Sequence, residues 1–197
     1  MSKLQSMCVF CGSKTGTNPA YAEAARELGT ALARQGLRLV FGGGNIGLMG
    51  VVADAVLEAA GEVTGVIPNS LVARELAHVG VSDLRIVESM HARKALMAEL
   101  SDGFVALPGG LGTFEELFEI LTWAQLDFHD KPVAVLNTYG YYTPLVNLID
   151  HAVAEGFIRR QHRNMLHVAN DVDELMSFFL SAPIDRIPHT DELRRLT

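Results

Sequence analysis

The sequence has few cysteines, little positive charge and no long apolar run, and each of these absences excludes a class of protein. The formal net charge is −7, so no general positive field exists to attract nucleic acid or an acidic membrane surface. Any phosphate site must therefore be local. The N-terminal residues lack the basic and apolar segments of a signal peptide, and no later apolar run reaches membrane-spanning length. We therefore expect a cytoplasmic protein with no nucleic acid and no membrane as its partner.

The two cysteines, Cys8 and Cys11, have the C-x-x-C spacing of redox and zinc sites. They lie in an apolar strand, however, where positions three apart point to opposite faces, and a redox pair needs a helix N-terminus to lower a thiol pKa. No second pair of cysteines or histidines completes a metal site. We expect two buried thiols, with no metal and no cofactor.

Hydrophobic residues make up 49% of the 197 residues and charged residues 20%, which indicates a chain with a large buried core. The length fits one nucleotide-binding α/β domain over residues 1–181. A C-terminal tail follows over residues 182–197, where two prolines and mixed charges interrupt the pattern.

Short apolar segments rich in strand-forming residues alternate with longer segments of helical period. The expected strands are residues 7–11, 37–41, 63–67, 84–87, 104–107 and 133–136, with a weaker seventh at 165–168. The expected helices begin near Pro19, Ile46, Leu71, Met90, Phe114, Tyr142 and Val172. This alternation predicts an α/β fold, a doubly wound, Rossmann-like parallel sheet of about seven strands with helices on both faces. In such sheets ligands bind beyond the carboxyl ends of the strands.

Two glycine-rich segments each follow a strand and lead into a helix. Residues 42–50 include Gly43 and Gly44, and residues 108–116 include Gly109. Glycines let the backbone approach a ligand closely, and the first free N–H groups of a helix point at an anion. The two segments together predict a phosphate cradle, although glycine triplets also serve plain tight turns.

The first glycine segment also fits the G-x-G-x-x-G pattern of dinucleotide-binding proteins, which expects an acidic residue about twenty positions further on. Glu62 has that spacing. It precedes the strand at 63–67, however, whereas the ribose-binding acid belongs at the far end of that strand. An NAD(P)-dependent oxidoreductase is therefore the less favoured alternative.

The second glycine segment continues directly into Thr113, Phe114, Glu115 and Glu116. Thr113 and Glu116 match the S/T-x-x-E capping box, which would explain both residues structurally. A carboxylate pair beside a phosphate cradle instead indicates a cationic group or a developing positive charge nearby. Both interpretations are open at this point.

Three basic residues, His91, Arg93 and Lys94, lie in the first turn of the helix that follows Ser89. Cations at this end of a helix oppose its dipole. Either an anion or an acidic neighbour compensates them, or the side chains are solvated at the surface. Lys94 is one of only four lysines, and a functional role is the favoured interpretation.

These segments together resemble the Lonely Guy (LOG) family of cytokinin-activating phosphoribohydrolases. The resemblance rests on residues 42–50, 90–94 and 108–116, and it extends in order and spacing over about residues 5–180. It implies hydrolysis of the N-glycosidic bond of a cytokinin riboside 5′-monophosphate, or of AMP, to free base and ribose 5-phosphate. Family members were long labelled lysine decarboxylases, a label that implies a pyridoxal-binding lysine for which these motifs give no support.

The resemblance also implies which residues act. The catalytic pair of the family, an arginine and a glutamate, falls on Arg93 and Glu116. The nucleotide contacts that carry over are Glu75, Lys94, Gly110, Leu111, Gly112, Thr113, Phe114, Glu115 and Thr122. Cleavage of a ribosyl C–N bond builds positive charge on the sugar, so the carboxylate of Glu116 would stabilise that charge and orient water. Arg93 stays charged and would hold the phosphate, the glutamate or the leaving base.

The helix expected at residues 114–126 is apolar over more than the stripe needed to cover a sheet. The excess is buried either inside the subunit or against a two-fold partner, and the resemblance implies a homodimer with active sites near the interface. A non-catalytic nucleotide-binding or carrier protein of the same fold is the alternative to an enzyme, and Arg93 and Glu116 argue against it. No motif residue reads the N6 substituent, so N6-prenylated and plain adenine are both open.

Overall fold

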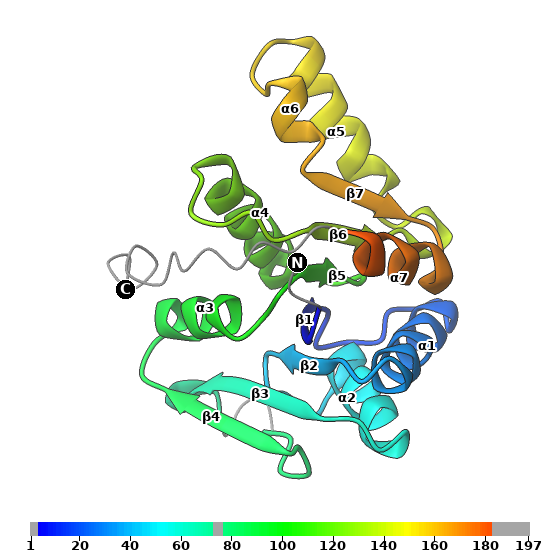
Figure 1. The fold of residues 1–197 in the computed structure, drawn as a ribbon, viewed down its shortest axis with the longest axis vertical. Helices are drawn as coiled ribbons and strands as arrows, with labels where there is room; N and C mark the ends of the chain where they lie inside the picture. Colours follow the sequence, from blue (N-terminus) through cyan, green and yellow to red (C-terminus); the bar gives the residue numbers. More distant parts are fainter. Residues whose placement is uncertain (1–3, 73–76, 183–197) are drawn as a thin grey trace.

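The computed structural model describes residues 4–72 and 77–182, which form one seven-stranded sheet (Figure 1). Every pairing in the sheet is parallel, and the strand order is β4-β3-β2-β1-β5-β6-β7. The strands are β1 Ser6–Phe10, β2 Arg38–Phe41, β3 Val63–Pro68, β4 Asp83–Val87, β5 Phe104–Ala106, β6 Val133–Leu136 and β7 Leu166–Ala169. The predicted doubly wound α/β fold is therefore confirmed, with each strand within two residues of its expected bounds.

The helices cover both faces of this sheet. They are α1 Ala20–Arg34, α2 Gly47–Glu58, α3 Met90–Glu99, α4 Leu111–Gln125, α5 Thr143–Ala154, α6 Arg160–Arg163 and α7 Val172–Ser181, with short 3₁₀ helices η1 Asn69–Leu71 and η2 Thr138–Gly140. One apolar cluster packs α1, α2 and α7 against the sheet, and a second packs α3, α4 and α5 against the opposite face. Figure 1 shows α1, α2 and α7 on one side of the strands and α3 and α4 on the other.

Both cysteines are buried and free, as predicted. Cys8 belongs to the cluster beneath α3 and α4, whereas Cys11 belongs to the cluster beneath α1 and α2. Their side chains therefore lie on opposite faces of the sheet, as the strand pattern requires. None of the described helices is long and apolar enough to cross a membrane.

The start of α4 differs from the prediction. The helix begins at Leu111, three residues before the expected Phe114, and its N-cap is Gly110, which makes no side-chain capping bond. Thr113 is thus the third residue inside the helix and cannot be the N-cap. The capping-box interpretation of Thr113 and Glu116 is wrong, and the cap does not explain either side chain.

Two further predictions fall largely on residues outside the described part of the chain. The helix expected near Leu71 is represented by η1, and residues 73–76, which follow it, lie outside the described part of the chain. The predicted tail also lies outside it, except for Ala182.

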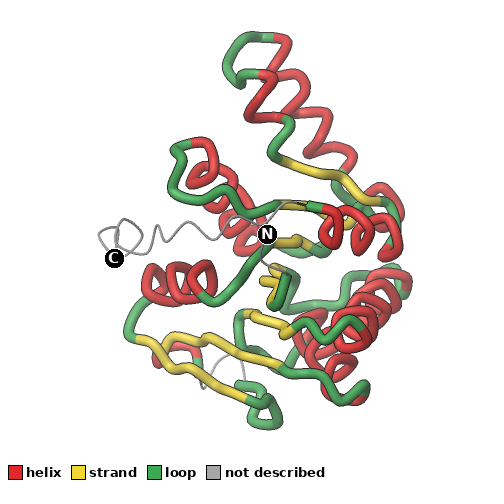
Figure 2. Tube along the Cα trace, in the orientation of Figure 1, coloured by secondary structure: helices red, strands yellow, loops and turns green. Residues whose placement is uncertain are grey.

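The direction in which successive strands are added to the sheet changes at β1. The chain adds β2, β3 and β4 on one side of β1 and then returns to place β5 on the other. Open parallel sheets bind ligands at such a switch point, beyond the carboxyl ends of the two central strands. Figure 2 draws the loops in green, and those that follow β1 and β5 contribute residues to the site described next.

Candidate active site

A cavity of about 270 Å³ lies at the switch point. Its walls come from the end of β1 and the residues after it (9–13), from Gly42 after β2, from Met90 and Arg93 of α3, and from the start of α4 (110–113, 115 and 116), with Met49 and Leu71 completing it. Segments far apart in the sequence thus meet here because parallel strands end at the same edge of the sheet.

The loop after β1 is a part of the site that sequence reasoning missed. Gly12 and Ser13 line the cavity. The backbone N–H of Gly12 donates to the carbonyl of Pro108 at 3.1 Å, and its carbonyl accepts from Leu48 N–H at 2.9 Å. This loop therefore ties the two glycine segments together. The available signal was a glycine, Gly12, directly after the strand expected at residues 7–11.

The start of α4 has the geometry of an anion site. Gly110, Leu111, Gly112 and Thr113 all line the cavity. A Cβ built on Gly110 or Gly112 would meet no atom within 4 Å, so open space lies in front of both residues. The free N–H groups of the first helical turn and the helix dipole favour an anion at such a position.

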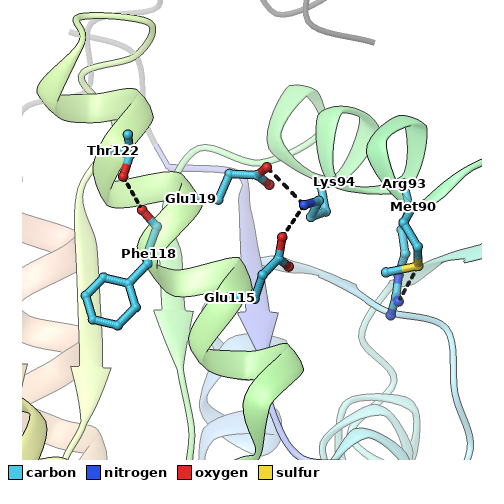
Figure 3. A network of polar contacts seen from close by, with 7 residues as sticks. All are labelled: Met90, Arg93, Lys94, Glu115, Phe118, Glu119 and Thr122. Carbon is cyan, nitrogen blue, oxygen red and sulfur yellow. Dashed lines mark hydrogen bonds and ion pairs between the residues drawn. The ribbon is translucent and has the colours of Figure 1, made fainter.

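Arg93 is held against the backbone of β3 and of the residue that follows β2. Its side chain is buried, with 5% of its surface exposed. Nε donates to the carbonyl of Val66 at 3.1 Å and Nη2 donates to the carbonyl of Gly42 at 3.0 Å. Nη1 lies 3.8 Å from Met90 Sδ (Figure 3). Surface solvation, the simple alternative for this basic helix start, is therefore wrong for Arg93.

Glu116 lines the same cavity as Arg93 and is also buried, with 9% of its surface exposed. Both charges act on the thiol at the end of β1. Burial raises the pKa of Cys11 most, the Glu116 carboxylate raises it further, and the Arg93 guanidinium lowers it. The structure thus brings the two predicted catalytic side chains, from α3 and α4, to one cavity.

Lys94 faces α4 rather than the cavity. Its Nζ donates to Glu119 Oε1 at 2.9 Å and also to the carboxylate of Glu115 (Figure 3). Burial alone would lower the pKa of Lys94, but the hydrogen bonds and charges of the two glutamates outweigh it and raise the pKa. The acidic neighbour that a cationic helix start requires is therefore present on α4. Glu119 was missed by sequence reasoning, although it follows Glu115 at helical spacing.

Two of the predicted substrate contacts, Phe114 and Thr122, are not among the residues that line the cavity, and a third was predicted at a position outside the described residues. Thr122 is exposed, and its hydroxyl donates to the Phe118 carbonyl at 2.7 Å (Figure 3). Phe114 packs its ring against those of Tyr141 and Tyr142. Glu75 lies outside the described residues. A substrate contact by each of these three predicted residues stays a prediction.

The predicted glycines of the first segment bind protein backbone. The Gly43 carbonyl accepts from His78 N–H at 2.9 Å, and Gly44 forms an isolated β-bridge with Ala77. Of the three consecutive glycines, it is Gly42 that lines the cavity. A Cβ on Gly42 would lie 1.9 Å from Arg93 Nη2, so a glycine is required for the close approach of the guanidinium.

Comparison with known proteins agrees with this geometry. The family model described as "Possible lysine decarboxylase" matches residues 49–179. The cytokinin riboside 5′-monophosphate phosphoribohydrolase LOG1 of Arabidopsis thaliana is 50% identical over 175 residues, covering 89% of this chain and 82% of that protein. The cytokinin riboside 5′-monophosphate phosphoribohydrolase of Rhodococcoides fascians is 50% identical over 170 residues, covering 86% of each chain.

Solved structures share the fold at lower identity. The molybdenum cofactor carrier protein of Chlamydomonas reinhardtii superposes with a TM-score of 0.68 at 25% identity, over 89% of this chain and 96% of that one. A molybdenum cofactor binding protein from Rippkaea orientalis has a TM-score of 0.67 at 22% identity, over 90% and 96%. The sequence identity to the two phosphoribohydrolases, over 86–89% of this chain, is at least twice the identity to these two solved structures. The chain therefore belongs to the family of the phosphoribohydrolases, the LOG family.

Proposed function

We propose that this chain hydrolyses the N-glycosidic bond of cytokinin riboside 5′-monophosphates, of AMP, or of both, and releases the free base and ribose 5-phosphate. The observation that carries the proposal is the meeting of Arg93 and Glu116, both buried, in one cavity beside the N-terminus of α4. The relatives with this activity in their names are about half identical to the chain.

The substrate's 5′-phosphate binds at the start of α4. The open space before Gly110 and Gly112 accepts it, and the backbone N–H groups of this turn donate to its oxygens. Helix N-termini favour dianions because the helix dipole adds to these hydrogen bonds. This placement leaves the ribose between the phosphate site and the pair of charged side chains.

Glu116 acts as the ionised carboxylate. As the C–N bond breaks, positive charge grows on the ribose ring, and a nearby carboxylate stabilises that charge and orients the attacking water. The Arg93 guanidinium, which lines the same cavity, favours the charged form of Glu116. Lys94 and Glu115, joined by their ion pair, fix the rim of the site on α4.

Arg93 stabilises negative charge. Two of its nitrogens are engaged with the carbonyls of Val66 and Gly42, so the guanidinium is fixed before substrate arrives. Nη1, which contacts Met90 Sδ, retains donor capacity for the phosphate or the departing base. Because arginine stays protonated at neutral pH, it contributes charge and hydrogen bonds and transfers no proton.

We further propose a homodimer, located in the cytoplasm, with neither nucleic acid nor membrane as a partner. The apolar excess of α4 is not buried inside the subunit, since Phe118 is 41% and Leu126 is 53% exposed. Thr122 lies between them at helical spacing, about 9 Å along the axis from Glu116. Its predicted substrate contact is therefore assigned to the site of the partner subunit. A monomer at micromolar concentration in sedimentation velocity would contradict this part of the proposal.

A substrate panel tests the activity. The protein is incubated with adenosine, AMP, ADP, ATP and N6-isopentenyladenosine 5′-monophosphate, and free base is followed by liquid chromatography. We expect base from the monophosphates only, and the ratio of the two kcat/KM values identifies the preferred base. A carrier protein of this fold would bind a monophosphate and release no base, and that result would replace the enzyme with the carrier.

A further inference from the structure

Two tyrosine hydroxyls hold the backbone that leads into α4. Tyr142 is fully buried, and its hydroxyl donates to the carbonyl of Leu107, directly after β5, at 2.7 Å. The hydroxyl of Tyr141 donates to the carbonyl of Gly109. Both tyrosines come from the segment between β6 and α5, so a neighbouring loop contacts the backbone that precedes α4.

The bond to Gly109 fixes the direction of one particular N–H group. In a planar trans peptide the C=O and the following N–H point in opposite directions, and no described peptide bond is cis. With the Gly109 carbonyl turned toward Tyr141, the N–H of Gly110 points away from Tyr141. Gly110 lines the cavity, and no described residue accepts a backbone hydrogen bond from its N–H. This N–H is therefore available to an anion in the cavity.

This peptide is the one in the loop that most needs to be held. It joins Gly109 to Gly110, and glycine backbones reach positive φ at little cost, so the peptide plane can turn over. In the turned state the carbonyl oxygen, rather than the N–H, would face the ligand. A carbonyl dipole directed at a phosphate is repulsive, so each turned molecule loses the site.

Tyr141 is itself well placed to hold the peptide. Its ring contacts Tyr21 of α1 edge-on at a centroid distance of 5.7 Å and stacks on Phe114 of α4 at 6.4 Å. The turn before it is fixed by Asn137, whose side-chain oxygen accepts from the N–H of Tyr142 at 2.7 Å. The hydroxyl is thus held by packing from two helices.

We propose that Tyr141 is a positioning residue for the phosphate of the substrate. Its hydroxyl holds the Gly109–Gly110 peptide in the orientation that presents the Gly110 N–H to the cavity. The identity of the ligand as a nucleoside 5′-phosphate rests on the proposed function, whereas the hold on the peptide rests on the geometry alone.

The test compares Tyr141→Phe with Tyr142→Phe as a matched control. Each variant keeps the ring and removes one hydroxyl that binds one carbonyl. The carbonyl of Leu107 precedes Pro108, which has no N–H, so releasing it frees no donor toward the cavity. Dissociation constants for AMP, inorganic phosphate and adenosine are measured by calorimetry, together with kcat and KM for base release and the thermal unfolding midpoint.

We expect Tyr141→Phe to weaken AMP and phosphate binding about tenfold, because the competent peptide orientation becomes a minor state. Adenosine binding should change less than twofold, and KM should rise more than kcat falls. Tyr142→Phe should lower the unfolding midpoint and leave the AMP dissociation constant within twofold. An unchanged AMP constant for Tyr141→Phe, or an equal loss in Tyr142→Phe, overturns the proposal.

A second variant keeps the test valid if either phenylalanine variant is unstable. A turned peptide moves Gly110 from its φ of −100° to a positive φ that alanine resists. The effect of Tyr141→Phe on AMP binding should therefore shrink at least threefold in the Gly110→Ala background. An undiminished effect would contradict the claim that the Tyr141 hydroxyl holds the orientation of the Gly109–Gly110 peptide. If the unmodified protein binds AMP no better than adenosine, the phosphate site of the proposed function fails first and the role of Tyr141 fails with it.

Discussion

The substitution Gly42→Ala should displace the Arg93 guanidinium without removing any functional side chain. A Cβ at this position would lie 1.9 Å from Arg93 Nη2 and 3.1 Å from Arg93 Cζ, and the next residue that it would meet is Met49, with Sδ at 3.3 Å. Gly42 is not among the positive-φ glycines, so the backbone accepts alanine. The atoms that must yield belong to the ends of two flexible side chains, and the protein should therefore fold.

The size of the effect follows from the distances. To restore an ordinary contact of about 3.5 Å, the guanidinium must move by about 1.5 Å from its 1.9 Å approach, and it loses its bond to the Gly42 carbonyl. The lost hydrogen bond costs about 1–3 kcal/mol of folding free energy. A catalytic group misplaced by about 1 Å can cost about a hundredfold in rate, so kcat/KM should fall by that factor.

Base release from AMP measures the rate, and urea unfolding measures the stability in parallel. In the Arg93→Met background, Gly42→Ala should change kcat/KM less than twofold, because the displaced group is already absent. Gly80→Ala, in an exposed loop outside the cavity, serves as the control substitution. A folded Gly42→Ala protein with kcat/KM within threefold of the unmodified protein would refute the claim that catalysis depends on the position of the Arg93 guanidinium.

Three further predictions concern the rest of the site. The raised pKa of Lys94 means that its ion pairs stabilise the fold fully below its ordinary pKa of 10.5, and that this contribution is lost as pH rises through the folded-state pKa. The loss of unfolding free energy between pH 10 and 12 should therefore be shallower in Lys94→Met, and equal slopes in the two proteins would contradict the ion pairs. Gly112→Ala should raise the unfolding free energy by up to about 1 kcal/mol and weaken AMP binding, because the new methyl group enters the open space before α4; tighter AMP binding would remove the phosphate from this position. Burial raises the pKa of both Cys8 and Cys11, so the native protein should resist alkylation by iodoacetamide at pH 8.5 and react only when unfolded; rapid alkylation of the native state would show that the thiols are accessible.

The strands and the central helices were predictable because apolar periodicity is a local property of the sequence. β6, Val133–Leu136, coincides with its predicted bounds. α6 was missed because Arg160–Arg163 contains no apolar residue and therefore has no period. The start of α4 was predicted three residues too late because the S/T-x-x-E pattern is also a local property of the sequence. The true start depends on where the chain leaves the sheet at the end of β5. Thr113 is buried there so tightly that a Cβ on Gly109 would lie 2.1 Å from its hydroxyl oxygen.

Contacts between elements were not predictable from motifs. The adjacent positions of Arg93 and Lys94 on α3 indicate that their side chains point in different directions. They do not indicate that Arg93 contacts the carbonyls of Val66 and Gly42 while Lys94 contacts α4. For the same reason Gly43 could be assigned to a turn, but its carbonyl bond to His78 could not be foreseen. Each of these contacts depends on how the elements pack around the sheet.

The most direct test of the account is the comparison of binding and base release in Glu116→Gln. Glutamine keeps the shape of the side chain and removes its charge, while the N–H groups at the start of α4 are unaffected. We predict that AMP binds within about threefold of its original affinity and that kcat for base release falls by about a thousandfold, a loss of the size found when a single charge-stabilising group is removed. Base release at the original rate by the folded variant would contradict the assignment of Glu116 to the chemistry.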